Sequence, residues 1–187
     1  SNTPNSWYYS KKMLYQTIKK NVESEGFTVL SDGLIMDDIN DYRPGVKARN
    51  EEGVRSLLQE AGLYKSEIRE LAKRAGVTNW NKTPSCSLAS RFPYGTRITP
   101  EKVEAVFKAE EYFTKRGFEP VRVRVHQDLA RIEVGADQIE KLVKNHEEIN
   151  KMMQDLGFLF VTVDLQGYKY GRMNDQLDEK TKKAAVE

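Results

Sequence analysis

The sequence predicts an α/β protein built from two parts that an irregular segment connects. Residues 1–80 hold helix-forming stretches around one short β-branched run. Residues 100–187 alternate between helix-forming and strand-forming stretches, and residues 81–99 between them show no apolar periodicity. Alternating helices and strands are typical of layered α/β folds. We therefore expect the domain boundaries to follow these three ranges.

The N-terminal part is expected to begin with a helix at Lys11–Ser24, which Gly26 terminates. The apolar face of this helix would carry Met13, Leu14, Ile18 and Val22. The run Phe27–Leu30 predicts a strand, and Ser31–Gly33 after it predicts a sharp turn. Two further helices are expected, at Glu51–Ala61 and Ser66–Ala75. A strand between helices indicates the end portion of a parallel sheet.

The C-terminal part is expected to form a small sandwich of helices on a sheet. Its elements should be a helix, two strands, a helix and a strand, at Glu101–Arg116, Val121–Val125, Ala130–Val134, Asp137–Leu156 and Phe158–Leu165. Thr99 suits the cap of the first helix, and Pro100 suits its first turn. This α-β-β-α-β order is close to the ferredoxin-like order. The apolar stripe of the first helix, at Val103, Val106, Phe107 and Phe113, also contains Glu110, where a carboxylate is out of place.

Composition and charge argue against several classes of protein. The longest apolar run, Leu156–Val163, is far shorter than the roughly 18 residues that a membrane helix needs. With 30 basic and 28 acidic residues the net charge is +2, which is too balanced for a general nucleic-acid or membrane-surface binder. We therefore expect no membrane and no nucleic-acid partner, and any anion site must be local.

The single cysteine, Cys86, indicates a reducing, cytoplasmic compartment, because it has no partner for an intramolecular disulfide. The two histidines, His126 and His146, cannot complete a CxxC-type zinc cluster with it. The sequence begins with serine and shows neither an initiator methionine nor a secretory signal pattern. We therefore expect the chain to be part of a longer protein.

The clearest functional pattern is the strict alternation within Pro120–His126. It places the valines on one face of a strand and Arg122, Arg124 and His126 on the other. Residues two apart on a strand lie roughly 6 to 7 Å apart, so the two guanidinium groups can converge on one phosphate. The alternative is a solvated sheet face whose charge is balanced by Glu133 on the next strand.

Cys86 lies in a loop rich in serine and proline, close to Arg91. Positive charge near a thiol favours the nucleophilic thiolate, which makes Cys86 a candidate nucleophile. The alternative is an inert, small hydrophobic residue, which is the commoner role of a lone cysteine. Ser90 and Arg91 offer a hydroxyl group and a guanidinium fork to an anionic substrate, but both are also ordinary loop residues.

Two features of the N-terminal part are weaker candidates. Asp32 and Gly33, in the turn after the expected strand, could present backbone N–H groups to a phosphate or an adenylate. Most such turns only reverse the chain. Trp7, followed by Tyr8 and Tyr9, could form a stacking surface, although aromatic residues near a terminus more often serve packing.

Three segments, Ser31–Gly45, Cys86–Gly95 and Asp164–Tyr168, together resemble the LarE family of ATP-dependent sacrificial sulfur transferases. The resemblance spans nearly the whole chain, and the ordered set is more specific than any one segment. It implies that residues 1–80 are the remainder of a PP-loop pyrophosphatase domain, whose phosphate-binding loop would precede this sequence. It also implies that the protein uses ATP with Mg²⁺, whose ligands the sequence does not identify.

The resemblance implies a reaction on pyridinium-3,5-biscarboxylic acid mononucleotide, in the synthesis of the nickel-pincer cofactor of lactate racemase. ATP would adenylate a substrate carboxylate, and the thiolate of Cys86 would then displace AMP. Elimination would leave the substrate thiocarboxylate and a dehydroalanine in place of the cysteine. A chain with one cysteine has no internal partner to restore it, which fits the sacrificial subtype, although another protein could deliver a persulfide.

By resemblance, Ser90, Arg122 and Arg124 match positions that hold the phosphate of the substrate. Arg91 is a neighbouring candidate for the same task. Glu110, the carboxylate that is out of place on its helix, becomes a candidate catalytic residue for proton handling or for contact with a metal.

The resemblance also assigns roles to the N-terminal part and to the assembly. Trp7 becomes a candidate for a mobile aromatic residue near the pocket, and Asp32 and Gly33 would border the adenylate. The family assembles as a hexamer. We therefore expect a homo-oligomer, with the C-terminal sheet as its contact.

Other functions stay open on the sequence alone. A PP-loop tRNA thiolation enzyme would need a long basic face for the nucleic-acid backbone, which the charge balance does not favour. An amidating enzyme of the GMP-synthetase type would adenylate its substrate without needing Cys86. A non-enzymatic module would use the C-terminal part only for oligomerisation or ligand binding.

Overall fold

The computed structural model of the chain describes residues 2–39, 41, 43–172 and 177. The chain divides into two compact units. The N-terminal unit comprises Pro4–Lys82, and the C-terminal unit comprises residues 83–172 together with Asn2 and Thr3. Within the described part of the chain, no helix has the length and apolar character needed to cross a bilayer.

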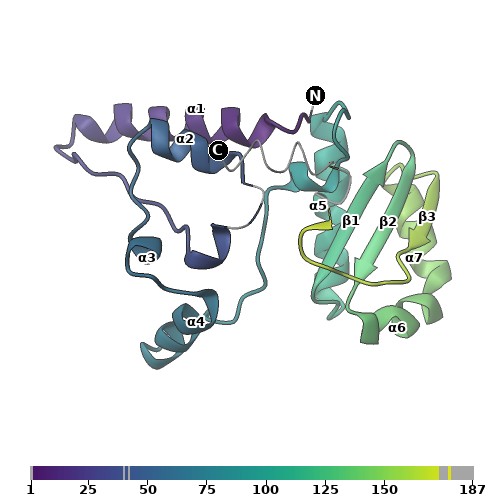
Figure 1. Cartoon of the computed structure of the whole chain (residues 1–187). Coiled ribbons are helices and arrows are strands. Elements are labelled where there is room, and N and C mark those ends of the chain that lie inside the picture. Colours follow the sequence, from purple (N-terminus) through teal and green to yellow (C-terminus); the bar gives the residue numbers. More distant parts are fainter. Residues whose placement is uncertain (1, 40, 42, 173–176, 178–187) are drawn as a thin grey trace. The chain divides into compact units, whose positions relative to one another are not determined.

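The described part of the N-terminal unit is helical (Figure 1). Its elements are α1 (Ser6–Glu23), a 3₁₀ helix η1 (Met36–Asp38), α2 (Gly45–Glu51), α3 (Leu57–Glu60) and α4 (Lys65–Arg74). Helix α1 packs against α2 and begins earlier than expected. Gly26 follows α1 with a φ of 82°, so the predicted stop is confirmed. The expected apolar face is wrong in part, because Met13 and Leu14 are exposed and Tyr15 is buried instead.

The strand expected at Phe27–Leu30 is wrong. This segment is irregular, and its neighbour Ser31 makes only an isolated parallel bridge with Arg55. Phe27 and Val29 are exposed. A run of strand-forming residues becomes a strand only where a neighbouring backbone forms hydrogen bonds along its length. Among the described residues, the bridge between Ser31 and Arg55 is the one such pairing next to this segment.

The helix expected at Glu51–Ala61 is also wrong, because the chain leaves the helical conformation at Gly53. Gly53 has a φ of 60°, and the N–H of Val54 donates to the carbonyl oxygen of Arg49 at 3.0 Å. This pattern ends α2 as a Schellman-type cap, for which a left-handed glycine is required. A separate short helix, α3, then begins at Leu57.

The C-terminal unit contains the sheet (Figure 1). Its elements are a 3₁₀ helix η2 (Leu88–Arg91), α5 (Pro100–Lys115), β1 (Val121–His126), β2 (Leu129–Val134), a 3₁₀ helix η3 (Ala136–Gln138), α6 (Ile139–Lys144), α7 (His146–Asp155) and β3 (Phe160–Val163). The strands lie in the order β1-β2-β3, with β1 antiparallel and β3 parallel to β2. A β-α-β-β-α-β unit has four strands, of which the described residues provide three, so the full ferredoxin-like arrangement stays a prediction.

The ends of the helices in this unit follow local side-chain chemistry. The side chain of Thr99 accepts a hydrogen bond from the N–H of Lys102, and Pro100 occupies the first turn of α5, as predicted. The single helix expected at Asp137–Leu156 is broken at Asn145. The side chain of Asn145 donates to the carbonyl oxygen of Lys141 at 2.7 Å, and such side-chain bonds compete with helix propagation.

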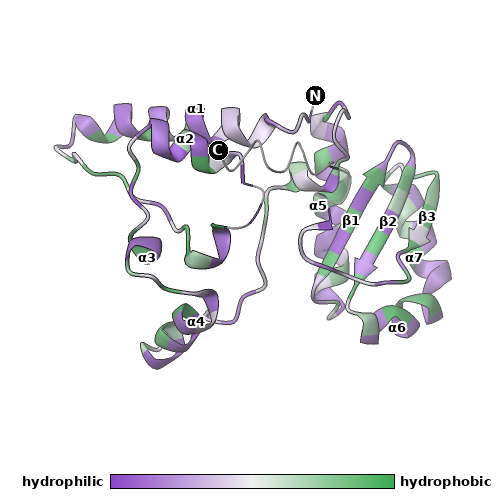
Figure 2. Cartoon of the chain, viewed as in Figure 1, coloured by the Kyte–Doolittle hydropathy of each residue, from purple (hydrophilic) through white to green (hydrophobic). Residues whose placement is uncertain are grey.

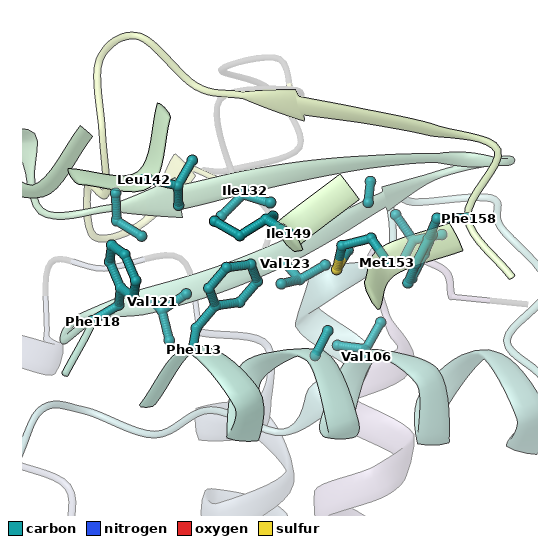
Figure 3. Close-up of a cluster of buried hydrophobic side chains, with 14 of the residues drawn as sticks. Val106, Phe113, Phe118, Val121, Val123, Ile132, Leu142, Ile149, Met153 and Phe158 are labelled. Atoms are coloured by element: carbon teal, nitrogen blue, oxygen red, sulfur yellow. The ribbon is translucent and has the colours of Figure 1, made fainter. Parts of the chain in front are cut away.

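The core lies between one face of the sheet and the helices that cover it (Figure 3). Hydropathy alternates along β1 (Figure 2), so the valines enter this core and the arginines face away from it. Phe113 and Phe118 meet edge to face with their centroids 5.8 Å apart. Burying each such side chain contributes about 1.5–3 kcal/mol. Phe107, which was expected on the stripe of α5, is instead 55% exposed.

Candidate functional site

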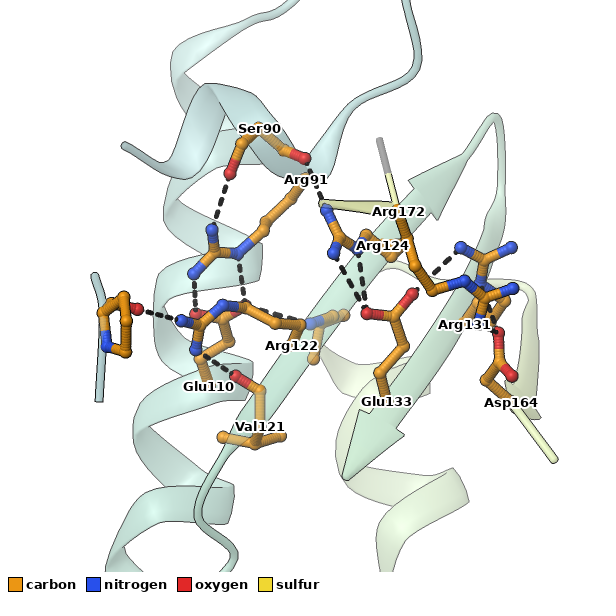
Figure 4. A network of polar contacts seen from close by, with 12 residues as sticks. Ser90, Arg91, Glu110, Val121, Arg122, Arg124, Arg131, Glu133, Asp164 and Arg172 are labelled. Carbon is orange, nitrogen blue, oxygen red and sulfur yellow. Dashed lines mark hydrogen bonds and ion pairs between the residues drawn. The ribbon is translucent and has the colours of Figure 1, made fainter. Parts of the chain in front are cut away.

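The polar face of the sheet carries a cluster of charged side chains (Figure 4). Arg122 and Arg124 lie half-buried on the face of β1 opposite the buried valines, which confirms the predicted alternation. Strand β2 adds Arg131 and Glu133 to the same face, because its register pairs Arg122 with Glu133 and Arg124 with Arg131. The face therefore holds more guanidinium groups than carboxylates.

Glu133 is fully buried and holds two of these arginines. Its Oε2 accepts hydrogen bonds from Nε and Nη2 of Arg124 at 3.1 and 3.0 Å, and its Oε1 accepts one from Arg131 at 3.0 Å. A buried carboxylate needs such partners, because an unpaired buried charge is strongly destabilising. The alternative reading, in which Glu133 balances the sheet face, therefore holds for Arg124 and Arg131.

Arg122 differs from its neighbours on this face. Its Nη1 and Nη2 donate to the carbonyl oxygens of Val121 and Pro84, at 2.6 and 2.5 Å. The ring of Tyr168 lies 5.2 Å from its guanidinium carbon. Among the described residues, no carboxylate forms an ion pair with Arg122. Within the described part of the chain, its positive charge therefore has no counter-ion and can meet an anion.

Arg91, which is buried, forms an ion pair with the partly buried Glu110 of α5 (Figure 4). Nε and Nη2 of Arg91 donate to the two carboxylate oxygens of Glu110 at 2.7 and 2.9 Å, and Nη1 donates to the hydroxyl of Ser90 at 2.7 Å. The guanidinium of Arg91 is thus committed to internal partners. The geometry favours a structural role for Arg91 over the expected contact with a phosphate.

The same contacts explain why a carboxylate occurs on the apolar stripe of α5. Strand β1 lies at the edge of the sheet, so some of its N–H groups point away from β2. Glu110 accepts the hydrogen bond of one of these, the N–H of Val123, at 2.9 Å. A buried N–H without an acceptor would cost about 1–3 kcal/mol. Proton handling by Glu110 stays a prediction, beside this structural role.

Cys86 is exposed, in the irregular segment that precedes η2. The two carbonyl groups on either side of it are held by neighbouring arginines of β1. Arg122 binds the carbonyl oxygen of Pro84, and Nη1 of Arg124 binds that of Ser90 at 2.8 Å. The thiol is thus open to solvent on a loop anchored at both ends, and it is not buried in apolar packing.

Sequence reasoning missed a residue that supports this loop from the other end of the chain. Asn2 is buried and donates from its side chain to the carbonyl oxygen of Phe92 at 2.8 Å. Its backbone pairs with Thr96 and Gly95 at 2.9 and 2.6 Å. No local pattern near the start of the sequence indicates this contact, because it joins segments about 90 residues apart.

The N-terminal candidates take different positions. The carboxylate of Asp32 accepts hydrogen bonds from the hydroxyl groups of Tyr15 and Ser56, at 2.8 and 2.5 Å, and from the N–H of Leu34. It is thus committed within its own unit. A Cβ at Gly33 would meet nothing within 4 Å, so the backbone there is open to a ligand. The adenylate contact of this turn stays a prediction.

Two further expectations concern Trp7 and a metal. Trp7 is half-buried in the first turn of α1, within a regular helix, and its place near a pocket stays a prediction. Across the described residues, no group of three or more His, Cys, Asp or Glu side chains is arranged to hold a metal ion. Mg²⁺ is usually held by one or two carboxylates together with substrate phosphates, so its use with ATP stays a prediction.

His126 extends the arginine face to the end of β1. Its Nε2 is buried and has no hydrogen-bond partner among the described groups. Burial, followed by the nearby charges of Arg131 and Arg124, lowers the pKa of His126, and Glu133 only partly opposes this. The folded state therefore favours the neutral imidazole.

We expect the stability of the protein to fall as the pH drops below about 6.5, the pKa of an unperturbed histidine. The unfolded chain takes up a proton on His126 at a higher pH than the folded chain does. Protonation therefore favours the unfolded state, and the free energy of unfolding falls as the pH drops below the pKa of the unfolded chain. The urea midpoint of unfolding should change less between pH 7.5 and pH 5.5 in His126→Gln than in the wild-type protein. The matched control is His146→Gln, at the exposed start of α7. Equal pH slopes in all three proteins would contradict this prediction.

Comparison with known proteins finds relatives that match nearly the whole chain. It is 50% identical over 177 residues to the pyridinium-3,5-bisthiocarboxylic acid mononucleotide synthase of Lactiplantibacillus plantarum. The aligned region covers 95% of this chain and 64% of the relative. It is also 40% identical to an uncharacterised protein of a Synechocystis species, over 93% of this chain and 66% of the relative. A third relative, an uncharacterised protein of Methanocaldococcus jannaschii, is 31% identical over 90% of this chain and 66% of its own length.

These matches confirm the resemblance that the three sequence segments indicate, because the chain is a homologue of the synthase over nearly its whole length. The chain spans slightly less than two thirds of the length of each of these relatives. No protein-family model matches it.

Proposed function

We propose that the complete protein is an ATP-dependent sulfur transferase in which Cys86 supplies the sulfur. The observation that carries the proposal is the exposed thiol on a loop whose flanking carbonyl groups are bound by Arg122 and Arg124. Homology to a synthase whose product is a bisthiocarboxylic acid mononucleotide supports the same chemistry. A pyridinium mononucleotide carries carboxylates to be converted and a phosphate that an arginine can bind.

The proposed reaction has three steps. A carboxylate oxygen of the substrate attacks the α-phosphorus of ATP, and pyrophosphate leaves. The thiolate of Cys86 then attacks the activated carbonyl carbon, and AMP leaves with the electrons of the broken C–O bond. Finally a base removes the α-proton of the cysteine, the Cβ–Sγ bond breaks, and the substrate departs as a thiocarboxylate while dehydroalanine stays in the chain.

The positions of the charged residues support a division of labour in this reaction. Arg122 has no carboxylate partner among the described residues, and Arg124, two residues further along β1, binds the carbonyl oxygen of Ser90. These three residues would hold the phosphate of the substrate. The pair of Arg91 and Glu110 would keep Ser90 in place. ATP use is inferred from homology.

We also propose that the complete protein acts as a homo-oligomer, as the resemblance of its sequence implies. The support is strand β3, which among the described residues pairs on one side, with β2; its first residue Phe160 and the preceding Leu159 are 60% and 61% exposed. Exposed apolar side chains on an open strand edge favour association. Sedimentation of the full-length protein tests this, and a monomer at all concentrations would contradict it.

The direct test uses full-length protein, ATP and one of two acceptors. With the pyridinium dicarboxylate mononucleotide we expect AMP, pyrophosphate and a thiocarboxylate product in amounts that do not exceed one sulfur per chain. Unmodified tRNA should give no thiolated product. Sulfur transfer to tRNA would favour the alternative thiolation enzyme, amide formation with ammonia would favour an amidating enzyme, and failure to form any adenylate would favour a binding module.

We expect Arg122→Gln to raise the half-saturating substrate concentration of the single-turnover reaction about 10- to 100-fold. A charge-assisted hydrogen bond to a phosphate is worth roughly 1.5–3 kcal/mol, which corresponds to this range. Arg116→Gln is the matched control, because Arg116 is exposed and pairs with Glu148 away from the sheet face. Equal changes in both variants would count against a phosphate site at Arg122.

A further inference from the structure

The segment Asp164–Tyr168 turns back tightly onto the end of β2. The N–H of Tyr168 donates to the carbonyl oxygen of Val134 at 2.7 Å, and the N–H of Gly167 donates to that of Asp164 at 3.0 Å. Gly167 has a φ of 68°, and a Cβ there would lie 2.8 Å from the carbonyl oxygen of Val134. Only glycine fits this approach. The backbone of Tyr168 is therefore fixed against the sheet.

Asp164 secures the other end of the turn. Its Oδ1 accepts a hydrogen bond from the N–H of Gln166 at 2.9 Å, and its Oδ2 lies 2.5 Å from Nη1 of Arg172 and 3.4 Å from Nε of Arg131. Burial acts to raise the pKa of Asp164, but these partners outweigh it and lower the pKa. The ionised carboxylate thus ties the turn to the arginine face of β2 (Figure 4).

The fixed turn brings the ring of Tyr168 to Arg122, with 5.2 Å between the ring centroid and the guanidinium carbon. At this distance an aromatic ring attracts a cation. The other arginines of the site are held by carboxylates, Arg91 by Glu110 and Arg124 by Glu133. A carboxylate orients an arginine but neutralises it. A ring orients the arginine and leaves its charge in place.

We propose that Tyr168 is a positioning residue that holds the guanidinium of Arg122 in one orientation, ready to bind a phosphate monoester. This inference rests on the proposed function, because it assigns a phosphate to Arg122. Arg122 has five N–H donors, and within the described part of the chain it uses two of them, on Val121 and Pro84. The remaining donors can bind an anion while the ring and the two carbonyl groups keep the side chain from moving.

The contact between Tyr168 and Arg122 can be measured without any ligand, by NMR of the full-length protein with ¹⁵N-labelled arginine. The Nε–H signal of Arg122, assigned from Arg122→Lys, should carry a ring-current shift. This shift should persist in Tyr168→Phe, which keeps the ring, and disappear in Tyr168→Leu. The matched control is Tyr112→Leu, which removes the ring that lies 3.6 Å from the guanidinium carbon of Arg116 on another surface. An unchanged Arg122 signal in Tyr168→Leu would overturn the proposal.

Titration with inorganic phosphate tests whether the contact between Tyr168 and Arg122 strengthens anion binding. We expect the dissociation constant to rise about fivefold in Tyr168→Leu, in line with the strength of a half-exposed cation–π contact, and to stay within about twofold of wild type in Tyr168→Phe and Tyr112→Leu. Far-UV circular dichroism confirms that each variant is folded. Equal weakening in Tyr168→Phe and Tyr168→Leu would overturn the positioning role, because the ring would not matter.

The two measurements separate this inference from the function on which it rests. A ring-dependent Arg122 signal in a wild-type protein that binds no phosphate would overturn the phosphate site of the proposed function, and with it the purpose assigned to Tyr168. Phosphate binding that needs Arg122 but ignores the ring would overturn the role of Tyr168 alone and leave the proposed function standing.

Discussion

Replacing Cys86 by alanine in the full-length protein should abolish sulfur transfer while adenylate formation continues. Alanine has no sulfur to give, and the carboxylate is activated before the thiol is used. The measurements are thiocarboxylate product by mass spectrometry and pyrophosphate release. The matched control is Ser85→Ala, which changes an exposed neighbour on the same loop and should keep both activities. Product formation by Cys86→Ala would contradict the proposed role of the thiol.

The mass of the protein after turnover provides a second test of whether Cys86 supplies the sulfur. After turnover with ATP and substrate, the wild-type chain should lose about 34 Da, the mass of hydrogen sulfide, through elimination at the cysteine. Peptide mapping should place the loss at Cys86 and nowhere else. Product accumulation with an unchanged chain mass would mean that sulfur is delivered to Cys86 from another source, and the sacrificial mechanism would be wrong.

The sequence predicts well those features that depend on short-range patterns. The alternation in Val121–His126 has the period of a strand, so both its core face and its arginine face follow from the residue order. Gly26 and Thr99 mark helix ends correctly, because capping depends on one or two residues. Phe27–Leu30 has strand-forming residues too, but pairing needs a neighbouring backbone, and that is not a property of the segment itself.

The sequence predicts which residues belong to the candidate site, but not which hydrogen bonds and ion pairs they form. Arg91, Arg122 and Arg124 are conspicuous in the sequence, yet which of them is neutralised depends on partners far along the chain. Arg91 meets Glu110 across 19 residues, whereas Arg122 reaches Pro84 across 38. Such distances are set by how α5 and η2 pack on the sheet. The structure therefore separates Arg91, which pairs with Glu110, from Arg122, which has no carboxylate partner among the described residues.

Removing the charge of Glu110 should cause a large loss of stability. In Glu110→Gln the guanidinium of Arg91, only 3% exposed, keeps its charge and loses its counter-ion. Breaking a buried ion pair in this way costs about 3–5 kcal/mol. The matched control is Glu111→Gln, because the half-exposed Glu111 forms a surface ion pair with the exposed Lys115. A surface pair of this kind contributes about 0–1 kcal/mol.

The amide of Val123 reports the local effect directly, because its N–H donates to Glu110. Its hydrogen exchange should accelerate about a hundredfold in Glu110→Gln, which corresponds to roughly 3 kcal/mol of lost protection. It should be unchanged in Glu111→Gln. Equal exchange rates at Val123 in the wild type and Glu110→Gln would contradict the structural role of Glu110.

A double variant then distinguishes structure from chemistry at Glu110. In Arg91→Met with Glu110→Leu both charges of the pair are gone, and replacing such a pair by apolar residues restores much of the stability. If Glu110 acts only by holding η2, and with it Ser90, against α5 and β1, sulfur transfer should recover together with stability. If stability recovers while sulfur transfer stays lost, Glu110 or Arg91 also takes part in the chemistry. Proton handling by Glu110 would then stand beside its contacts with Arg91 and Val123.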